Sequence, residues 1–159
     1  MLILWDSEHI LKAYFNPDTD TFDLVSSCLA EEGRATTIDG AMSLGVDDEG
    51  LFHHLSIVVD SEASREGFPE RPSECPVASL AEVELVDDGG AKVCFDSPNG
   101  ILRITFDGVE AVDWARLGPN LVWLALNEEG HLAAIVTEGV SRDPKGKAQA
   151  TWLAEMGSD

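Results

Sequence analysis

Basic residues are scarce in this sequence: ten Lys and Arg face 30 Asp and Glu among 159 residues, and the formal net charge is −20. This balance disfavours a nucleic-acid partner, because such partners are held by Lys and Arg that displace counterions, and we expect none. An anionic membrane is disfavoured because its surface also attracts basic residues, and we expect no membrane partner. Residues 1–138 carry the whole excess, with 27 acids against seven bases, whereas residues 139–159 are balanced. The charge favours a basic protein partner, and an adaptation to a high-salt habitat is the alternative.

Cysteine is also scarce, with only Cys28, Cys75 and Cys94 and no Cys-x-x-Cys pair. Zinc knuckles and thioredoxin-type sites are therefore not indicated. An odd number of unpaired cysteines is typical of free thiols in a reducing cytoplasm. The N-terminal stretch "MLILWDSEHI" lacks the basic region of a signal peptide, and no apolar run reaches membrane-spanning length. These features predict a cytoplasmic protein.

Motifs of catalysis and cofactor binding are lacking too. The sequence has neither a Gly-rich phosphate loop nor a dinucleotide fingerprint. "AMSLG" around Ser43 resembles a degenerate nucleophile elbow, but an elbow needs a helix after it and a hairpin turn, "VDDEG", follows instead. We therefore expect no enzymatic activity and no cofactor.

Short β-rich runs separated by turns make up most of the sequence. In the second half "AEVELV", "AKVCF" and "ILRITF" are separated by "DDGG" and "DSPNG", and "NLVWLAL" and "HLAAIVT" flank "NEEG". Asn-Gly and Asp-Gly tolerate the positive φ angles of tight hairpins, so the pattern predicts antiparallel strands. In the first half "LILW" and "ILKAYF" flank "DSEH", which predicts a hairpin there as well.

The two halves resemble each other. "LWDSEHILKAYFN" aligns with "CFDSPNGILRITFD", "LGVDDEG" with "LALNEEG", and "HLSIVVDSEAS" with "HLAAIVTEGVS", in the same order along the chain. We predict a mainly β fold, in which two duplicated antiparallel β-meander units pack as a sandwich or as a pseudo-twofold pair. The predicted segments are a first copy at 1–59, a Pro/Glu/Ser-rich loop or linker at 60–79, a second copy at 80–138 and a C-terminal helix and tail at 139–159, all within one compact unit.

The tail predicts one short helix. Asp143 followed by Pro144 is typical of an N-cap and first helical position. Trp152 and Met156 are four residues apart and so share one helical face. Trp152 is expected to pack on the sheet, and a neighbouring chain is the alternative.

Each copy resembles a small uncharacterised bacterial β domain. The residues that carry the likeness are an early strand with an Asp turn, Trp5-Asp6 and Phe95-Asp96, and a later acidic turn before a strand, Asp47 to Gly50 and Asn127 to Gly130. The resemblance implies a fold and no activity. In composition, the chain is similar to acidic toxin-immunity proteins.

The acidic turns are the main candidate partner-binding residues, namely Asp47, Asp48, Glu49, Glu128 and Glu129. They lack the alternating oxygen ligands and the distal Glu of a calcium loop. Solvated turn residues are the alternative interpretation. Trp114, which stands at the end of an expected strand, is a candidate interface anchor, and core packing is its alternative.

Adjacent His53 and His54 are expected to point to opposite faces of a strand, one of them toward the core. They cannot both bind one ion from a regular strand. His54 aligns with His131 between the copies, which leaves a His pair as a candidate metal site, although metal sites need three or more ligands.

The leading hypothesis is a non-enzymatic acidic binding protein, for example an immunity protein that neutralises a basic toxin or effector domain. A structural or assembly module that forms a homodimer is the second hypothesis. A small enzyme or a metal-binding protein is the third.

Overall fold

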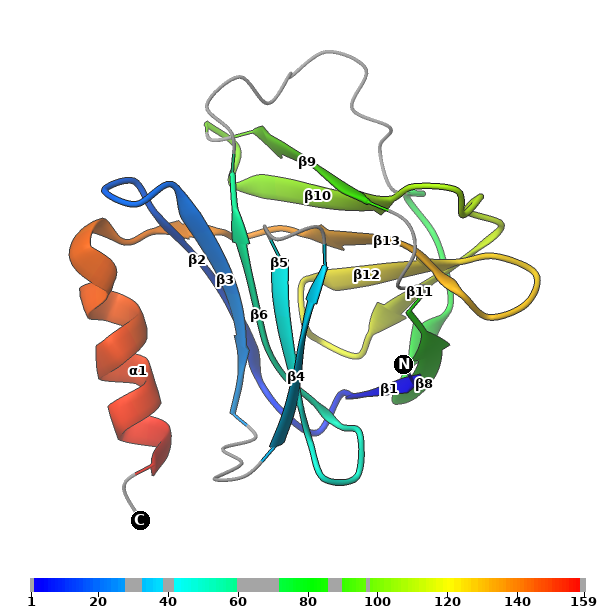
Figure 1. Ribbon diagram of the computed structural model, residues 1–159, viewed down its shortest axis with the longest axis horizontal. Helices are drawn as coiled ribbons and strands as arrows, with labels where there is room; N and C mark the ends of the chain where they lie inside the picture. Colours follow the sequence, from blue (N-terminus) through cyan, green and yellow to red (C-terminus); the bar gives the residue numbers. More distant parts are fainter. Residues whose placement is uncertain are drawn as a thin grey trace.

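The computed structural model describes residues 2–27, 33–38, 42–59, 72–85, 90–96 and 98–157, with the backbone alone described at 33–38 and 157 (Figure 1). Cys28, most of the expected linker (60–71) and the expected turn residues Asp87 to Gly89 lie outside the described residues. The elements are β1 (Leu2–Asp6), β2 (Leu11–Asn16), β3 (Thr21–Ser26), β4 (Gly33–Ile38), β5 (Met42–Asp47), β6 (Phe52–Val58), β7 (Val77–Ala78), β8 (Leu80–Glu84), β9 (Ala91–Asp96), β10 (Ile101–Phe106), β11 (Asp113–Leu117), β12 (Val122–Leu126), β13 (Leu132–Thr137), β14 (Ser141–Arg142), a 3₁₀ turn (Pro144–Gly146) and α1 (Lys147–Gly157).

Two six-stranded sheets form the body of the molecule. The first has the strand order β14-β2-β3-β6-β5-β4, and the second has the order β7-β11-β12-β13-β10-β9. Figure 1 shows the strands of one sheet running across those of the other. The prediction of a mainly β protein with a short C-terminal helix is confirmed. Among the described residues, no helix is long and apolar enough to cross a membrane.

The two sheets have the same arrangement of strands, and equivalent strands are separated by the same number of residues along the chain. The order β2-β3-β6-β5-β4 in the first matches β9-β10-β13-β12-β11 in the second. Phe22 pairs with Ile57 as Leu102 pairs with Thr137, so the registers match as well. Phe22 and Leu102 hold equivalent places in the two sheets. We call the number of positions between them along the chain the repeat offset. Any two residues separated by the repeat offset are called counterparts. Each sheet also has a β-bulge at counterpart positions, after Gly45 in one and after Ala125 in the other.

Neither half is a continuous meander, which corrects the expected strand pairing. β6 lies between β3 and β5, so the chain crosses over from β3 to β4 at the far edge. The expected hairpin of "LILW" with "ILKAYF" is also wrong, because β1 pairs with β8. The alignment of "LWDSEHILKAYFN" with "CFDSPNGILRITFD" was shifted by one strand, since the repeat offset relates β2 to β9. Turn signals mark where a strand ends, but they do not say which strand becomes its partner.

One hydrophobic core joins the two sheets. Its inward side chains occupy counterpart positions in both halves, which are Leu24, Leu44 and Leu55 in the first and Ile104, Leu124 and Ile135 in the second. Successive side chains of a strand point to opposite faces of the sheet, and these residues point to the inner face. The rings of Phe15 and Phe95, which are also counterparts, lie 4.8 Å from each other across the sheets. The sequence therefore forms a single packed unit.

The C-terminal helix covers part of the outer face of the first sheet. Trp152 is buried there against Tyr14 and Val25, which confirms its predicted packing on the sheet. Asp143 is buried, and its carboxylate accepts hydrogen bonds from the backbone N–H groups of Ala148 and Gln149 at 2.7 and 3.0 Å. The expected capping role is fulfilled across the intervening 3₁₀ turn.

Candidate functional site

The acidic turn between β5 and β6 is built around the side chain of Asp47. Its Oδ1 atom accepts hydrogen bonds from the backbone N–H groups of Glu49 and Leu51, at 2.9 and 2.8 Å. Gly50 completes the turn with a φ of +89°, a conformation that glycine adopts without steric cost. Asp47 is half-buried, and its carboxylate stabilises the turn through these hydrogen bonds.

The turn between β12 and β13 repeats this arrangement with an amide. Oδ1 of Asn127 accepts from the N–H groups of Glu129 and His131, both at 2.9 Å. Asp47 and Asn127 thus stabilise their turns through the same two backbone hydrogen bonds, although Asp47 is charged and Asn127 is neutral. The remaining acids of the two turns are exposed, namely Asp48, Glu49, Glu128 and Glu129.

Both turns are attached to the small two-stranded sheet of β1 and β8, the β1–β8 ribbon. The carbonyl oxygen of Gly50 accepts from the N–H of Leu4 at 2.8 Å, and that of Gly130 accepts from the N–H of Glu84 at 3.1 Å. Four chain segments therefore lie side by side, and three spacings of about 4.8 Å place the outer two roughly 14 Å apart. The two turns flank the ribbon, one on each side (Figure 1).

Carboxylates of the ribbon lie between the two turns. Glu82 and Glu84 are exposed on β8. We call the six exposed carboxylates of the turns and the ribbon the acidic face; they belong to Asp48, Glu49, Glu82, Glu84, Glu128 and Glu129. One base lies within it: Nε2 of His131 is 3.5 Å from Glu84, and Nδ1 is 3.6 Å from Glu129. Like charges on one surface produce a negative potential that attracts cationic groups.

The two candidate metal-binding histidines are not brought together. Nε2 of His54 lies 3.0 Å from Oδ1 of Asp23 on the first sheet, whereas His131 lies at the acidic face. The repeat offset makes Ala134 the counterpart of His54, so the predicted His pair is wrong. Within the described ranges, no group of three or more His, Cys, Asp or Glu side chains is arranged to hold a metal ion.

His53 does not alternate with His54 as a regular strand requires. Gly45 pairs with His54 and Val46 with Phe52, so His53 is the extra residue of the bulge. Both histidines are half-buried and neither belongs to the core, so the expectation that one faces the core is wrong. Burial lowers the pKa of His53, and the neighbouring His54 lowers it further.

Trp114 lies on the outer face of the second sheet and is not part of the acidic face. It packs against a small cluster of alanines, Ala125, Ala133 and Ala134. The guanidinium of Arg103 lies 5.4 Å from the centroid of its ring. Arg103 is buried, and desolvation lowers its pKa. Trp114 is half-buried, so it is not the freely exposed anchor that the interface hypothesis requires.

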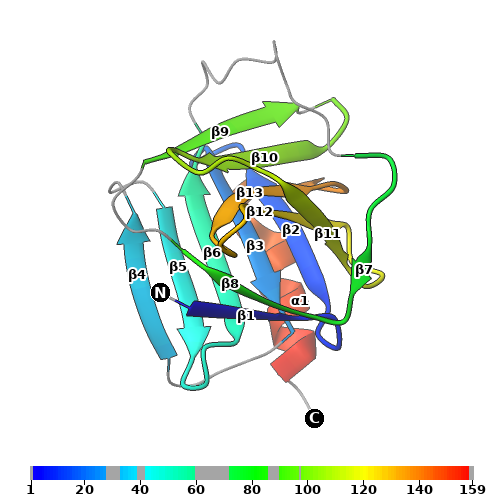
Figure 2. The ribbon, with the colours of Figure 1, turned by 90° about the vertical axis from the view of Figure 1, so that its right-hand side faces the viewer.

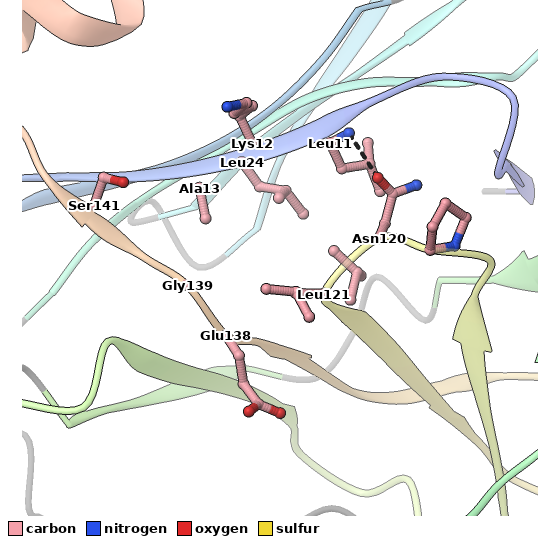
Figure 3. Close-up of a pocket in the computed structure, with 11 residues that line it drawn as sticks. Leu11, Lys12, Ala13, Leu24, Asn120, Leu121, Glu138, Gly139 and Ser141 are labelled. Carbon is pink, nitrogen blue, oxygen red and sulfur yellow. Dashed lines mark hydrogen bonds between the residues drawn. The ribbon is translucent and has the colours of Figure 1, made fainter.

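Sequence reasoning missed a cavity of about 240 Å³ at the junction of the two sheets. Figure 3 shows Leu24 and Leu121 facing its interior, while the charged end of Glu138 points away from it. Asn120 at its rim accepts a hydrogen bond from the N–H of Leu11 and donates one to the carbonyl of His9, both at 3.1 Å. Segments far apart in the sequence build this cavity, so no local motif indicates it. Apolar side chains such as Leu24 and Leu121 line it together with polar ones such as Asn120 and Ser141.

No model of a known protein family matches the sequence. No curated protein matches it either.

Proposed function

We propose that this protein is a non-enzymatic binding protein that captures a basic protein domain on its acidic face. An immunity protein that neutralises a basic toxin or effector is the concrete biological form of this proposal. One observation carries it: the two acidic turns are hydrogen-bonded to the two strands of one ribbon, so their charges add on one surface. A basic surface of matching size would be attracted by the whole acidic face, from one turn to the other.

Electrostatic attraction would act mainly on the rate of encounter. Complementary charge raises association rate constants by roughly 10- to 1,000-fold, and added salt reduces this gain because the Debye length is only about 8 Å at physiological ionic strength.

The cytoplasm is the proposed compartment, which is supported by Cys75 and Cys94 being free thiols.

The test measures dissociation constants against salt concentration for a panel of purified basic protein domains, with an acidic domain as the negative control. The double variant Asp48→Lys/Glu128→Lys removes one exposed carboxylate from each turn and leaves the turn-forming Asp47 and Asn127 intact. We expect the affinity to fall about tenfold or more, equivalent to about 1.4 kcal/mol. The variant Glu110→Lys/Asp113→Lys is the matched control, because both residues are exposed and the net charge changes equally.

Equal losses for the two variants would mean that net charge, and not the acidic face, governs binding. An affinity that added salt leaves unchanged would exclude the electrostatic mechanism.

A second candidate is an assembly module, which one observation favours. Within the described part of the chain, β9 stands at an edge of the second sheet with β10 as its single strand partner. Its counterpart β2 is covered by the short parallel strand β14. An open edge can pair with another chain. Light scattering at high protein concentration tests this candidate, since a strict monomer argues against it.

A further inference from the structure

Exposed leucines lie inside the acidic face. Leu2 is 51% exposed and Leu80 is 61% exposed, although both belong to paired strands. Alternate residues of a strand point to one side, so the outward side of the β1–β8 ribbon is defined by its burial pattern. Figure 2 shows this ribbon at the side of the molecule that faces the viewer. Its outward residues are Leu2, Leu4 and Asp6 from β1, and Leu80, Glu82 and Glu84 from β8.

The register of the ribbon shows how these six side chains are arranged. Leu2 stands opposite Glu84, Leu4 opposite Glu82, and Asp6 opposite Leu80. The leucines therefore form one continuous apolar strip, which passes diagonally from β1 to β8. Glu82 and Glu84 lie along β8 beside Leu4 and Leu2, and Asp6 lies on the other side of this strip at the end of β1.

Acidic groups border the apolar strip on both sides. Glu82 and Glu84 lie along one side, with Glu128 and Glu129 beyond them. The turn that carries Asp48 and Glu49 is hydrogen-bonded to Leu4 on the other side. Exposed apolar residues within a charged rim are the usual composition of a protein-binding surface.

A second copy of this chain is a poor occupant of the strip. Two such faces brought together would place carboxylates against carboxylates, and like charges juxtaposed at an interface cost several kcal/mol. The occupant must instead carry positive charge on both sides of an apolar stripe.

We infer that this face binds a basic amphipathic helix of the partner, whose apolar residues contact the leucine strip while its Lys and Arg side chains contact the carboxylates on both sides. The dimensions agree, since a helix with its side chains is about 10–12 Å across and the flanking turns are roughly 14 Å apart. Leu2 and Leu4 are separated by about 7 Å along the strand, and residues four apart on one helical face are separated by about 6 Å along the helix axis. This inference rests on the proposed function and adds to it the kind of element that is recognised.

The experiment compares two fluorescent synthetic peptides that have the same Leu and Lys composition and the same charge. One places its leucines on a single helical face, and the other has them shuffled around the helix. Binding to the whole protein is measured by fluorescence anisotropy. We expect the amphipathic peptide to bind at least tenfold more tightly than the shuffled one.

The variant Leu2→Thr/Leu80→Thr should abolish this preference, because Thr keeps a high strand propensity but removes the apolar strip. Val58→Thr is the matched control, since Val58 is 56% exposed on β6 and lies outside the ribbon. The circular dichroism spectrum of each variant checks its fold, and Leu2→Met/Leu80→Met should retain the preference.

Equal binding of both peptides, lost on addition of salt, would overturn the helix inference and leave the proposed function standing. An unchanged preference in the Leu2→Thr/Leu80→Thr variant would also overturn the inference, because the strip would not be its source. No binding of either peptide would contradict both the inference and the proposed function.

Discussion

Ile3 pairs with Val83 at the centre of the β1–β8 ribbon, and both side chains are completely buried. The repeat offset relates these two residues, so a residue of one half meets its own counterpart from the other. The pairs on either side are related by the same exchange, since Leu2 pairs with Glu84 and Leu4 with Glu82. A pseudo-twofold axis therefore passes between Ile3 and Val83. The two halves meet in a shared strand pair and not only through stacked faces.

Replacing Ile3 by Ala should destabilise both halves together. Removal of a buried Ile side chain costs about 2–5 kcal/mol in a packed core. Urea unfolding followed by circular dichroism and by tryptophan fluorescence should give one coincident transition, shifted to lower urea. The exposed neighbour Leu2→Ala is the control and should shift the midpoint little. Two separate transitions would show that the halves fold independently.

Asp47→Asn should preserve the stability that Asp47→Ala loses. The amide oxygen of Asn can accept the same two backbone hydrogen bonds, as Asn127 does in the second turn. Asp47→Ala removes both acceptors and should lower the free energy of unfolding by about 1–3 kcal/mol. Chemical denaturation measures the difference. Asp48→Ala in the exposed part of the turn should change stability by less than about 0.5 kcal/mol.

Gly118→Ala should be more damaging than Gly108→Ala, although both glycines have positive φ angles of +54° and +80°. A Cβ atom at Gly118 would lie 2.6 Å from the Cβ of Ser7, so the second sheet and the start of the chain would be pushed apart. At Gly108 the added atom meets nothing within 4 Å, and only the conformational cost of about 1–2 kcal/mol remains. Thermal unfolding of the two variants tests the order. Equal losses would mean that the contact with Ser7 yields freely.

The sequence was sufficient for properties that depend on neighbouring residues. Acid–acid–glycine spacing predicted the turns at Gly50 and Gly130, and an Asp before a Pro predicted the cap of α1. The internal likeness of the halves was visible in the sequence, although only the alignment of "LGVDDEG" with "LALNEEG" has the repeat offset. Strand pairing was harder to predict, since Leu4 meets Glu82 from the other half and no local pattern records that partner. The bulge at His53 could not be predicted from the sequence either. One extra residue in a strand changes the face to which every following residue points, so the expected faces of His53 and His54 were wrong.

The leucine strip illustrates the same limit at the candidate site. Leu2 and Leu4 alternate with Ile3 and Trp5 in an almost wholly apolar segment, so the sequence does not show which of them are buried. Only the pairing of β1 with β8 places Leu80 diagonally across from Leu4 and brings both turns to the same ribbon. The acidic turns were predictable as turns, and their shared surface depended on contacts between the two halves.

Asp143→Ala should release the N-terminal end of α1. The two backbone N–H groups that its carboxylate binds would lose their acceptor, and loss of an N-cap costs about 0.5–2 kcal/mol. Trp152 should then contact Tyr14 less firmly, which fluorescence quenching by acrylamide can detect. Asp143→Asn keeps an acceptor and should lose less. The exposed Lys147→Ala is the control, and an equal effect there would contradict the capping role.

Stability should depend on pH through His53 in a defined direction. Burial, assisted by the positive charge of His54, lowers the pKa of His53 in the folded state, while Asp47 opposes the shift. The unfolded chain therefore binds a proton at His53 more readily than the folded protein does. Folding is unaffected well above the unfolded pKa of about 6.5, and stability is lost as the pH falls through that value toward the lower folded pKa. We expect the wild type to lose more stability than His53→Gln between pH 7.5 and pH 5, as measured by urea unfolding at each pH. Parallel curves for the two proteins would contradict the lowered pKa, and the same comparison with His54→Gln separates the effect of burial from that of the neighbouring charge.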